Sequence, residues 1–312
     1  MNSQTKWMLA AAGALGAAAT ATLLLRQERY SFRGKAVFIT GGSRGLGMRI
    51  ARILGNEGAR LTLISRHAEG LKSIEQALAK TGADVLTLVC DVRDRNQVQE
   101  AIDASVEAYG SLDVLINNAG VIQVGPFEDM TLEDFETAMA IHAWGPLYTT
   151  LAALPYMRRQ GGGRIVNVSS IGGKIAVPHL MPYTVSKFAL AGLSDGMRAE
   201  LSKYGIWVTS VYPGLMRTGS HVYADTKGNA GSEFAWFSFL ASTPVIAINA
   251  DRAARQIVEA CRKGSPELVI TPQAKMAVLT NAIAPGLVGR MSALVNRFLP
   301  KPTVDITGKR AA

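Results

Sequence analysis

Short apolar runs alternate with amphipathic stretches through most of the chain. The runs are rich in β-branched residues, and each is followed by a segment with apolar residues at helical spacing, as at Leu46, Ile50 and Leu54. The runs lie at residues 35–40, 59–65, 84–90, 114–117, 164–170 and 205–214. Apolar strands that are each followed by a helix indicate a parallel sheet covered on both faces. The pattern therefore predicts an α/β fold.

The chain has 312 residues, with no linker near its middle and no internal repeat. One large domain is the simplest interpretation, because α/β domains of this size are common. We expect residues 1–32 to form a hydrophobic anchor with a basic flank and residues 33–272 to form the folded domain. Residues 273–312 are expected to form an apolar or amphipathic C-terminal extension.

Residues 7–25 form an uncharged apolar stretch of 19 residues. As a helix they would span about 28 Å, close to the ~30 Å hydrocarbon core of a bilayer. A surface helix or a cleaved signal peptide is the alternative, but three leucines run directly into Arg26 without a small-residue cleavage site. Basic residues crowd after the stretch, and only Lys6 precedes it. We therefore predict a membrane anchor with the rest of the chain on the cytoplasmic side.

The net charge of +9 raises the question of a nucleic-acid partner. The basic residues are spread along the chain without a Lys/Arg run or an aromatic-interleaved basic motif, so no nucleic-acid partner is predicted. Solubility and attraction to an anionic membrane surface account for the charge. Cys90 and Cys261 lack the spacing of a metal site or a disulfide framework.

A glycine-rich turn, TGGSRGLG at residues 40–47, follows the first apolar run and opens a helix. In that context Gly41 can take the tight turn, Gly45 lets the backbone approach a pyrophosphate, and Gly47 permits close packing of helix on strand. The positive end of the helix would receive the phosphate. A glycine turn without a ligand is the alternative.

The second apolar run ends in Ser65 and Arg66, where an NAD-binding fold of this kind would place an acidic residue on the ribose hydroxyls. An arginine there accommodates a 2′-phosphate instead. Arg44, inside the glycine turn, is a second cation aimed at the same region. These residues predict NADP(H) in preference to NAD(H), the alternative being that either arginine simply faces water.

Tyr183 and Lys187 are four residues apart in a segment with strong helical character, so both side chains leave one face of the helix. A neighbouring cation favours the phenolate, and we expect Lys187 to lower the pKa of Tyr183 toward neutrality. Such a tyrosine can exchange protons with a substrate. Ser170, at the end of an apolar run, could hold a substrate oxygen. A solvated lysine beside a half-buried tyrosine is the alternative.

The remaining candidates follow strand ends, where ligands of parallel sheets bind. The strand ends carry Gly41, Ser65, Asp91, Asn118, Ser170 and Pro213. Asp91 could reach an adenine amino group or could cap the following helix.

Taken together, six motifs occur in the order and spacing typical of the short-chain dehydrogenase/reductase family, which the chain resembles over roughly residues 33 to 262. They are TGGSRGLG (40–47), Asp91-Val92, NNAG (117–120), Ser170, YTVSK (183–187) and PGLMRT (213–218). The resemblance implies a single Rossmann domain, a doubly wound parallel sheet of about seven strands flanked by helices, usually in dimers or tetramers. It also implies hydride transfer between a nicotinamide and a carbonyl/alcohol pair.

By this resemblance, Tyr183 is the general acid/base, Lys187 lowers its pKa and holds the nicotinamide ribose, and Ser170 orients the substrate oxygen. Thr218 resembles the contact to the carboxamide. His142 stands where the family often has an asparagine that helps a water carry protons; it either keeps that relay or is merely satisfied in the helix interface. The other predicted cofactor contacts are Ser43, Leu46, Val92, Ala119, Gly120 and Gly214.

The family usually places a variable substrate lid between Gly219 and Ala250. Here that region carries several aromatic residues, among them Phe234, Trp236 and Phe237, which suggests a bulky apolar substrate such as a steroid, retinoid-like or fatty-acyl carbonyl. Packing against the body or a subunit interface is the alternative. The C-terminal extension could lie on a membrane surface or complete a dimer.

Two functions follow from these features. The first is an NADP(H)-dependent oxidoreductase that acts on a lipophilic alcohol or ketone, in a membrane-associated lipid or hydroxysteroid dehydrogenase setting. The second is a catalytically quiet NADP(H)-binding sensor or assembly factor at a membrane. A sugar-nucleotide epimerase or dehydratase is disfavoured by the glycine spacing.

Overall fold

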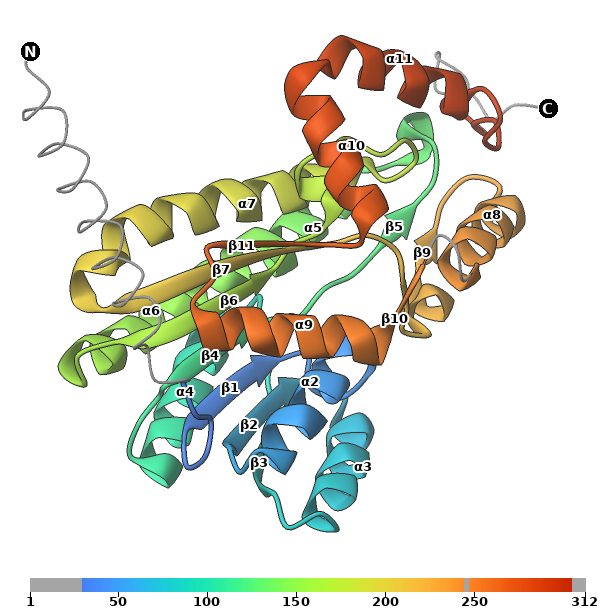
Figure 1. Ribbon diagram of the computed structural model, residues 1–312. Coiled ribbons are helices and arrows are strands. Elements are labelled where there is room, and N and C mark those ends of the chain that lie inside the picture. Colours follow the sequence, from blue (N-terminus) through green and yellow to red (C-terminus); the bar gives the residue numbers. More distant parts are fainter. Residues whose placement is uncertain (1–29, 244–246, 305–312) are drawn as a thin grey trace, which may run out of the picture. The chain divides into compact units, whose positions relative to one another are not determined.

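The computed structural model describes residues 30–243 and 247–304. The chain divides into two units, Met1–Ser31 and Phe32–Ala312, and the fold below is that of the second. Its centre is a seven-stranded sheet in the order β11-β7-β6-β4-β1-β2-β3, in which every neighbouring pair is parallel (Figure 1). The strand order reverses direction at β1, so the sheet is doubly wound. The predicted α/β fold with about seven parallel strands is confirmed.

Six of the seven strands coincide with the apolar runs of the sequence, and β11 was not among the predicted ones. The strands β1 and β4 are buried along their whole length. The seven strands are β1 (Ala36–Thr40), β2 (Arg60–Ser65), β3 (Asp84–Val89), β4 (Val114–Asn117), β6 (Gly163–Val168), β7 (Ile206–Pro213) and β11 (Glu267–Ile270). The register places Thr40 beside Ile64 and Asn117 beside Asn167. The carboxyl ends of neighbouring strands therefore lie together at one edge.

Helices cover both faces of the sheet (Figure 1). On one face lie α2 (Gly45–Asn56), α3 (Ala68–Ala79) and α9 (Ala250–Lys263). On the other lie α4 (Arg95–Tyr109), α6 (Gly145–Arg159) and α7 (Met181–Leu201). The main core cluster fills the space beneath the second group, where Ile102, Met157 and Ile165 are fully buried.

Shorter elements complete the edge at which the strands end, and the C-terminal extension adds two helices. The helical elements are η1 (Phe127–Asp129), α5 (Leu132–Met139), η2 (Ala140–Trp144), η3 (Ile171–Gly173), η4 (Ser202–Tyr204), η5 (Ser220–Tyr223), α8 (Ala230–Ser242), α10 (Pro272–Ile283) and α11 (Pro285–Asn296). The short strands are β5 (Gln123–Val124), β8 (Met216–Arg217), β9 (Asp225–Thr226) and β10 (Ile248–Asn249). The η2 segment is a π-helical turn, which periodicity alone did not predict.

A buried polar network ties α7 to the sheet. The Asn117 side chain donates to Asn167 Oδ1 at 2.9 Å, and Asn167 donates to Ser194 Oγ at 2.8 Å. Thr149 Oγ1 donates to Asn117 Oδ1 at 2.7 Å. Each amide oxygen accepts and each amide nitrogen donates, which is what burial of these groups requires. The network fixes the helix that carries Tyr183 and Lys187 against β4 and β6.

The length and composition of the helices contradict the prediction of a membrane-anchored protein. Within residues 30–243 and 247–304, none is both long enough and apolar enough to cross a bilayer. The longest of these helices, α7, carries four charged residues, Lys187, Asp195, Arg198 and Glu200, so its length does not make it a span. The segment 7–25, on which the anchor, the transmembrane helix and the cytoplasmic orientation were predicted, lies outside the described residues. The membrane localisation is therefore not supported.

Candidate active site

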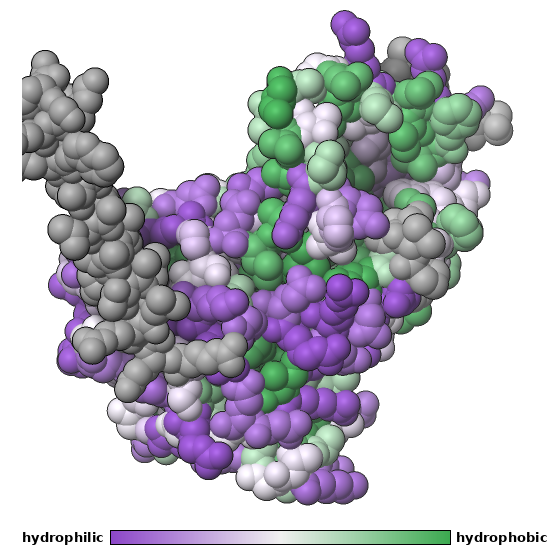
Figure 2. Space-filling view, in the orientation of Figure 1, coloured by the Kyte–Doolittle hydropathy of each residue, from purple (hydrophilic) through white to green (hydrophobic). Residues whose placement is uncertain are grey.

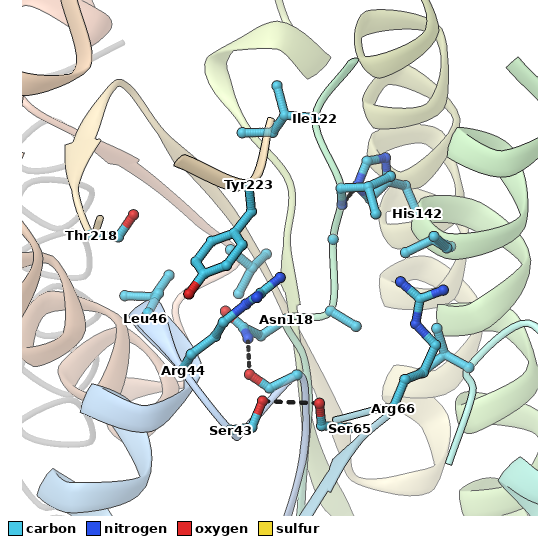
Figure 3. A pocket seen from close by; sticks show the side chains of 18 of the residues that line it. Ser43, Arg44, Leu46, Ser65, Arg66, Asn118, Ile122, His142, Thr218 and Tyr223 are labelled. Atoms are coloured by element: carbon cyan, nitrogen blue, oxygen red, sulfur yellow. Dashed lines mark hydrogen bonds between the residues drawn. The ribbon is translucent and has the colours of Figure 1, made fainter. Parts of the chain in front are cut away.

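A pocket opens at the carboxyl edge of the sheet, between the glycine turn, the strand ends and the start of α7 (Figure 3). Most of the predicted cofactor residues line it together: Gly41, Ser43, Arg44, Gly45, Leu46, Ser65, Arg66, Asp91, Val92, Asn118, Ala119, Gly120, Tyr183, Lys187 and Thr218. His142 also lines it. Gly47, Pro213, Gly214 and Ser170 do not belong to its lining.

The glycine turn brings α2 close to the end of β4. Gly41 has φ +66°, a conformation in which side chains are strained. At Gly47 an added Cβ would lie 2.3 Å from the Gly41 carbonyl oxygen and 2.6 Å from the Asn118 amide nitrogen. Gly47 therefore permits the close packing predicted for it, although it does not face the pocket.

The start of α2 suits a phosphate. The residue that precedes the helix, Arg44, makes no side-chain hydrogen bond to the first backbone N–H groups. Those donors have no partner within the helix and carry the positive end of its dipole. An anionic group placed over this turn would receive them, so the residues present fit a dinucleotide.

Two arginines enter the pocket from opposite sides, above a pair of serines (Figure 3). Ser43 Oγ donates to Ser65 Oγ at 2.9 Å. Ser65 stands where an NAD-binding fold of this kind would have an acidic residue. The Arg44 guanidinium lies 3.7 Å from the centre of the Tyr223 ring, a cation–π contact. Arg66 Nη1 lies 3.9 Å from Asp91 Oδ2. The serines carry no charge, so this end of the pocket is positive.

Asp91 is held by a residue that the sequence did not single out. Arg93 Nε donates to Asp91 Oδ1 at 3.1 Å and to Oδ2 at 2.9 Å, and Arg93 Nη2 donates to Oδ2 at 2.7 Å. Burial acts to raise the pKa of Asp91, but hydrogen bonding by Arg93 outweighs it and leaves that pKa below its usual value. The following helix is capped by Asp94, which accepts from the backbone of Asn96 and Gln97. Asp91 therefore does not cap the helix, and the adenine contact stays a prediction.

Tyr183, Lys187 and Ser170 come together at the start of α7. Lys187 Nζ lies 5.5 Å from the centre of the Tyr183 ring and donates to the Val168 carbonyl oxygen at 2.9 Å. An added Cβ at Gly172 would lie 3.3 Å from the Tyr183 ring and 3.5 Å from Ser170 Oγ, so both side chains border Gly172. A side-chain hydrogen bond joins Ser170 to Tyr183. The predicted grouping of the three side chains is present.

The electrostatics of this group differ from the prediction. Burial raises the pKa of Tyr183 above its usual value, and a hydrogen bond with Ser170 opposes that shift. Burial lowers the pKa of Lys187 to about 7. The expectation that Lys187 lowers the pKa of Tyr183 is therefore wrong for this structure, because burial disfavours the charged forms of both groups.

His142 is fully buried in the π-helical turn η2. Its Nε2 accepts from the Val121 backbone N–H at 3.1 Å, so the proton is on Nδ1, which donates to Ser186 Oγ at 2.8 Å. Ser186 Oγ donates in turn to the Tyr183 carbonyl at 2.8 Å. Burial, followed by the charge of Lys187, holds the pKa of His142 well below its usual range. Both ring nitrogens are used by protein groups, as for a histidine satisfied in the helix interface.

Two further residues shape the pocket and were missed from the sequence. Thr40 Oγ1 accepts from the backbone N–H groups of Asn118 and Ala119, each at 2.9 Å, and so fixes the loop after β4. Tyr223 covers Arg44 from η5. Thr40 could have been found from its place at a strand end. Tyr223 had no local signal.

Comparison with known proteins agrees with this architecture. The family profile described as short chain dehydrogenase matches residues 35–227. A dehydrogenase/reductase SDR family member 7B from Bos taurus is 33% identical over 276 residues, which cover 86% of this chain and 83% of the relative. Levodione reductase from Leifsonia aquatica is 35% identical over 190 residues, which cover 60% of this chain and 71% of the relative.

Solved structures show the same fold. The crystal structure of levodione reductase superposes with a TM-score of 0.70 at 29% identity and covers 78% of this chain and 99% of its own. A short chain dehydrogenase/reductase from Burkholderia phymatum, in complex with NAD, gives a TM-score of 0.77 at 23% identity over 83% of this chain and 96% of its own, a likeness that bears on the fold alone. The profile match spans more than half of the residues and the Bos taurus relative aligns over most of both chains, so the chain belongs to the short-chain dehydrogenase family.

Proposed function

We propose that the protein is an NADP(H)-dependent oxidoreductase that transfers hydride between the nicotinamide and a carbonyl/alcohol pair of a lipophilic substrate. The observation that carries the proposal is the group of Ser170, Tyr183 and Lys187 beside a pocket whose far end holds Arg44 and Arg66. The relatives named levodione reductase and gluconate 5-dehydrogenase support oxidoreductase chemistry.

Each residue of the group has a role that its surroundings support. NADP(H), when bound, supplies or accepts the hydride. The raised pKa keeps the Tyr183 phenol protonated at neutral pH, which is the state needed to donate a proton to a carbonyl oxygen. Ser170 orients that oxygen. Lys187, with a pKa of about 7, gains its charge readily when negative charge develops nearby.

The substrate side is apolar. A second cluster of packed residues, with Val124, Leu180 and Phe237 buried, includes the Tyr183 ring and Trp236 at its edge. Two of the four phenylalanines and tryptophans of α8, Trp236 and Phe237, thus belong to the same packed cluster as the Tyr183 ring. The other two, Phe234 and Phe239, are exposed. These contacts support a lipophilic ketone or alcohol as the substrate class.

Replacing either pocket arginine tests the cofactor. Arg44→Ala and Arg66→Ala are each expected to weaken NADPH binding by about 10- to 100-fold, since each removes a charge-assisted contact to the 2′-phosphate. NADH binding should change by less than about threefold. Titration calorimetry with both nucleotides measures the ratio. Arg52→Ala, an exposed arginine of α2, is the control. Equal losses for the two nucleotides would contradict the NADP(H) proposal.

Tyr183→Phe tests the reaction. The variant is expected to lose about 10²- to 10⁴-fold in kcat for NADPH-dependent reduction of lipophilic ketones, because it keeps the ring and loses the proton donor. Its affinity for NADPH should stay within about threefold of the wild type. Tyr204→Phe makes the same change in η4, away from the pocket. If the wild type binds NADPH and reduces nothing in a broad ketone panel, the quiet NADP(H)-binding function is the better account.

Lys187→Met tests the buried ammonium through stability. Lys187 titrates near pH 7 in the fold and near 10.5 when unfolded, so the unfolded chain binds the extra proton between those values. The wild type should therefore gain stability relative to Lys187→Met as pH rises through that window, by about 1.4 kcal/mol per pH unit. Urea unfolding of both proteins at pH 7, 8 and 9 measures the difference. A constant difference would mean that the lysine is not buried as a neutral amine.

We also propose a homo-oligomer that uses the C-terminal extension. Exposed apolar side chains lie along α10 and α11 (Figure 2). They include Met276, Leu279, Ile283, Leu287 and Met291.

Sedimentation should give a multiple of the 33.2 kDa chain mass. The double change Ile283→Asp with Leu287→Asp should shift it toward the monomer, because charges would then lie in the interface. Leu132→Asp, an equally exposed leucine on α5, should not. A wild-type protein that sediments as a monomer at micromolar concentration would exclude the assembly.

A further inference from the structure

A buried acid–base cluster joins the helix α8 to the loop in front of Tyr183. Glu233 has no exposed surface and His179 is 6% exposed. His179 Nδ1 lies 2.8 and 3.0 Å from the two carboxylate oxygens of Glu233, and Trp236 Nε1 donates to Glu233 Oε2 at 2.6 Å. The two residues that form the core of this cluster are 54 positions apart in the sequence.

Both oxygens of the Glu233 carboxylate have hydrogen-bond partners. The carboxylate accepts from the imidazole and from the indole, and it sits in the first turn of α8, where the helix dipole favours a negative group. The His179 and Trp236 rings meet edge to face with centres 6.1 Å apart. A buried carboxylate with these donors stabilises one arrangement of its surroundings, and removing a donor leaves the carboxylate with one hydrogen bond fewer.

His179 also has an unusual backbone conformation. Its φ is +62°, a conformation that non-glycine residues rarely adopt. Its carbonyl oxygen accepts from the Gly125 backbone N–H at 2.8 Å, which links the same residue to β5. Backbone strain of this kind persists only where the surroundings over-determine it, and it concentrates at sites of function. Here Glu233 on one side and Gly125 on the other fix the residue.

The cluster stands beside the apolar residues that surround the catalytic tyrosine. Leu180, next to His179, packs with Val124, Phe237 and the Tyr183 ring. The backbone N–H of Thr184 donates to the Leu180 carbonyl at 2.7 Å, so the loop passes directly into the helix that carries Tyr183. The helix α8 otherwise packs on the short elements β5, β8, β9 and η5 (Figure 1). Glu233 adds to these contacts a buried polar link between α8 and the loop that precedes Tyr183.

We propose that Glu233, His179 and Trp236 form a latch that holds α8 closed over the substrate side of Tyr183 and so determines how tightly an apolar substrate is held. Glu233 and His179 are positioning residues, since neither is placed on the reacting atoms. The predicted effect on substrate affinity rests on the proposed oxidoreductase function. The predicted effect on the stability of α8 rests on the structure alone.

Hydrogen exchange of the full-length protein tests the latch without reference to activity. Glu233→Gln should raise exchange of the amides in 230–242 by on the order of tenfold, because one partner of two charge-assisted bonds is replaced by an amide that must also present a donor. Trp236→Phe, which keeps an aromatic ring but removes the indole donor and part of the side-chain volume, should act in the same direction and more weakly. Glu133→Gln makes the same chemical change in the first turn of α5 at an exposed position and should change nothing.

Kinetics separate the latch from general damage. In Glu233→Gln the KM for a bulky lipophilic ketone should rise on the order of tenfold while kcat and NADPH affinity stay within about twofold, since substrate binding and not the proton donor is affected. Unchanged exchange in 230–242, or an increase shared equally with α3, would overturn the latch. Increased exchange in α8 with an unchanged KM would overturn its role toward substrate. If the wild type reduces no ketone, the proposed function fails, and the exchange result still decides whether the latch exists.

Discussion

The site depends on a lysine ammonium taken out of water next to a phenol. Lys187 is buried, and its ammonium donates a hydrogen bond to the carbonyl oxygen of Val168 at the end of β6. Such a group is costly to keep charged, which is why its pKa falls to about 7. The fold tolerates it because Asn117, Asn167 and Ser194 fix α7 to the sheet with every polar group paired. A buried lysine whose pKa is lowered to about 7 can respond, through its own charge, to the charge of a bound group.

The rest of the pocket complements this lysine. Arg44 and Arg66 lie at the far end, the uncapped start of α2 lies between, and His142 stays neutral behind the tyrosine. The lining is therefore positive near Arg44, Arg66 and the start of α2. Near Tyr183 it is positive only when Lys187 is protonated. The dinucleotide with an additional phosphate that we propose as cofactor would place its negative charge where the fixed cations are. Asp91 does not oppose it, since Arg93 already neutralises that carboxylate.

The sequence predicted the fold and most of the pocket because both follow from local pattern. Apolar runs followed by amphipathic helices imply the parallel sheet, and the register then brings strand ends such as Thr40 and Asn117 to one edge. What failed needed three-dimensional knowledge. The shift of the Tyr183 pKa depends on how deeply the phenol is buried, which a spacing of four residues does not state. The Arg44–Tyr223 contact joins residues with no common motif. The membrane prediction rested on residues 7–25 and the basic residues that flank them, and no helix of the described residues supports it.

His142 shows how a departure from a family pattern is absorbed by its surroundings. An imidazole is larger than an asparagine side chain, and it lies in a π-helical turn with its Nε2 about 3.1 Å from where a Gly120 Cβ would stand. Gly120 therefore supplies the room that the ring requires. The ring in turn joins the loop after β4 to Ser186 and, through it, to the backbone of Tyr183. One neutral side chain thus connects the loop after β4 with the helix that carries Tyr183.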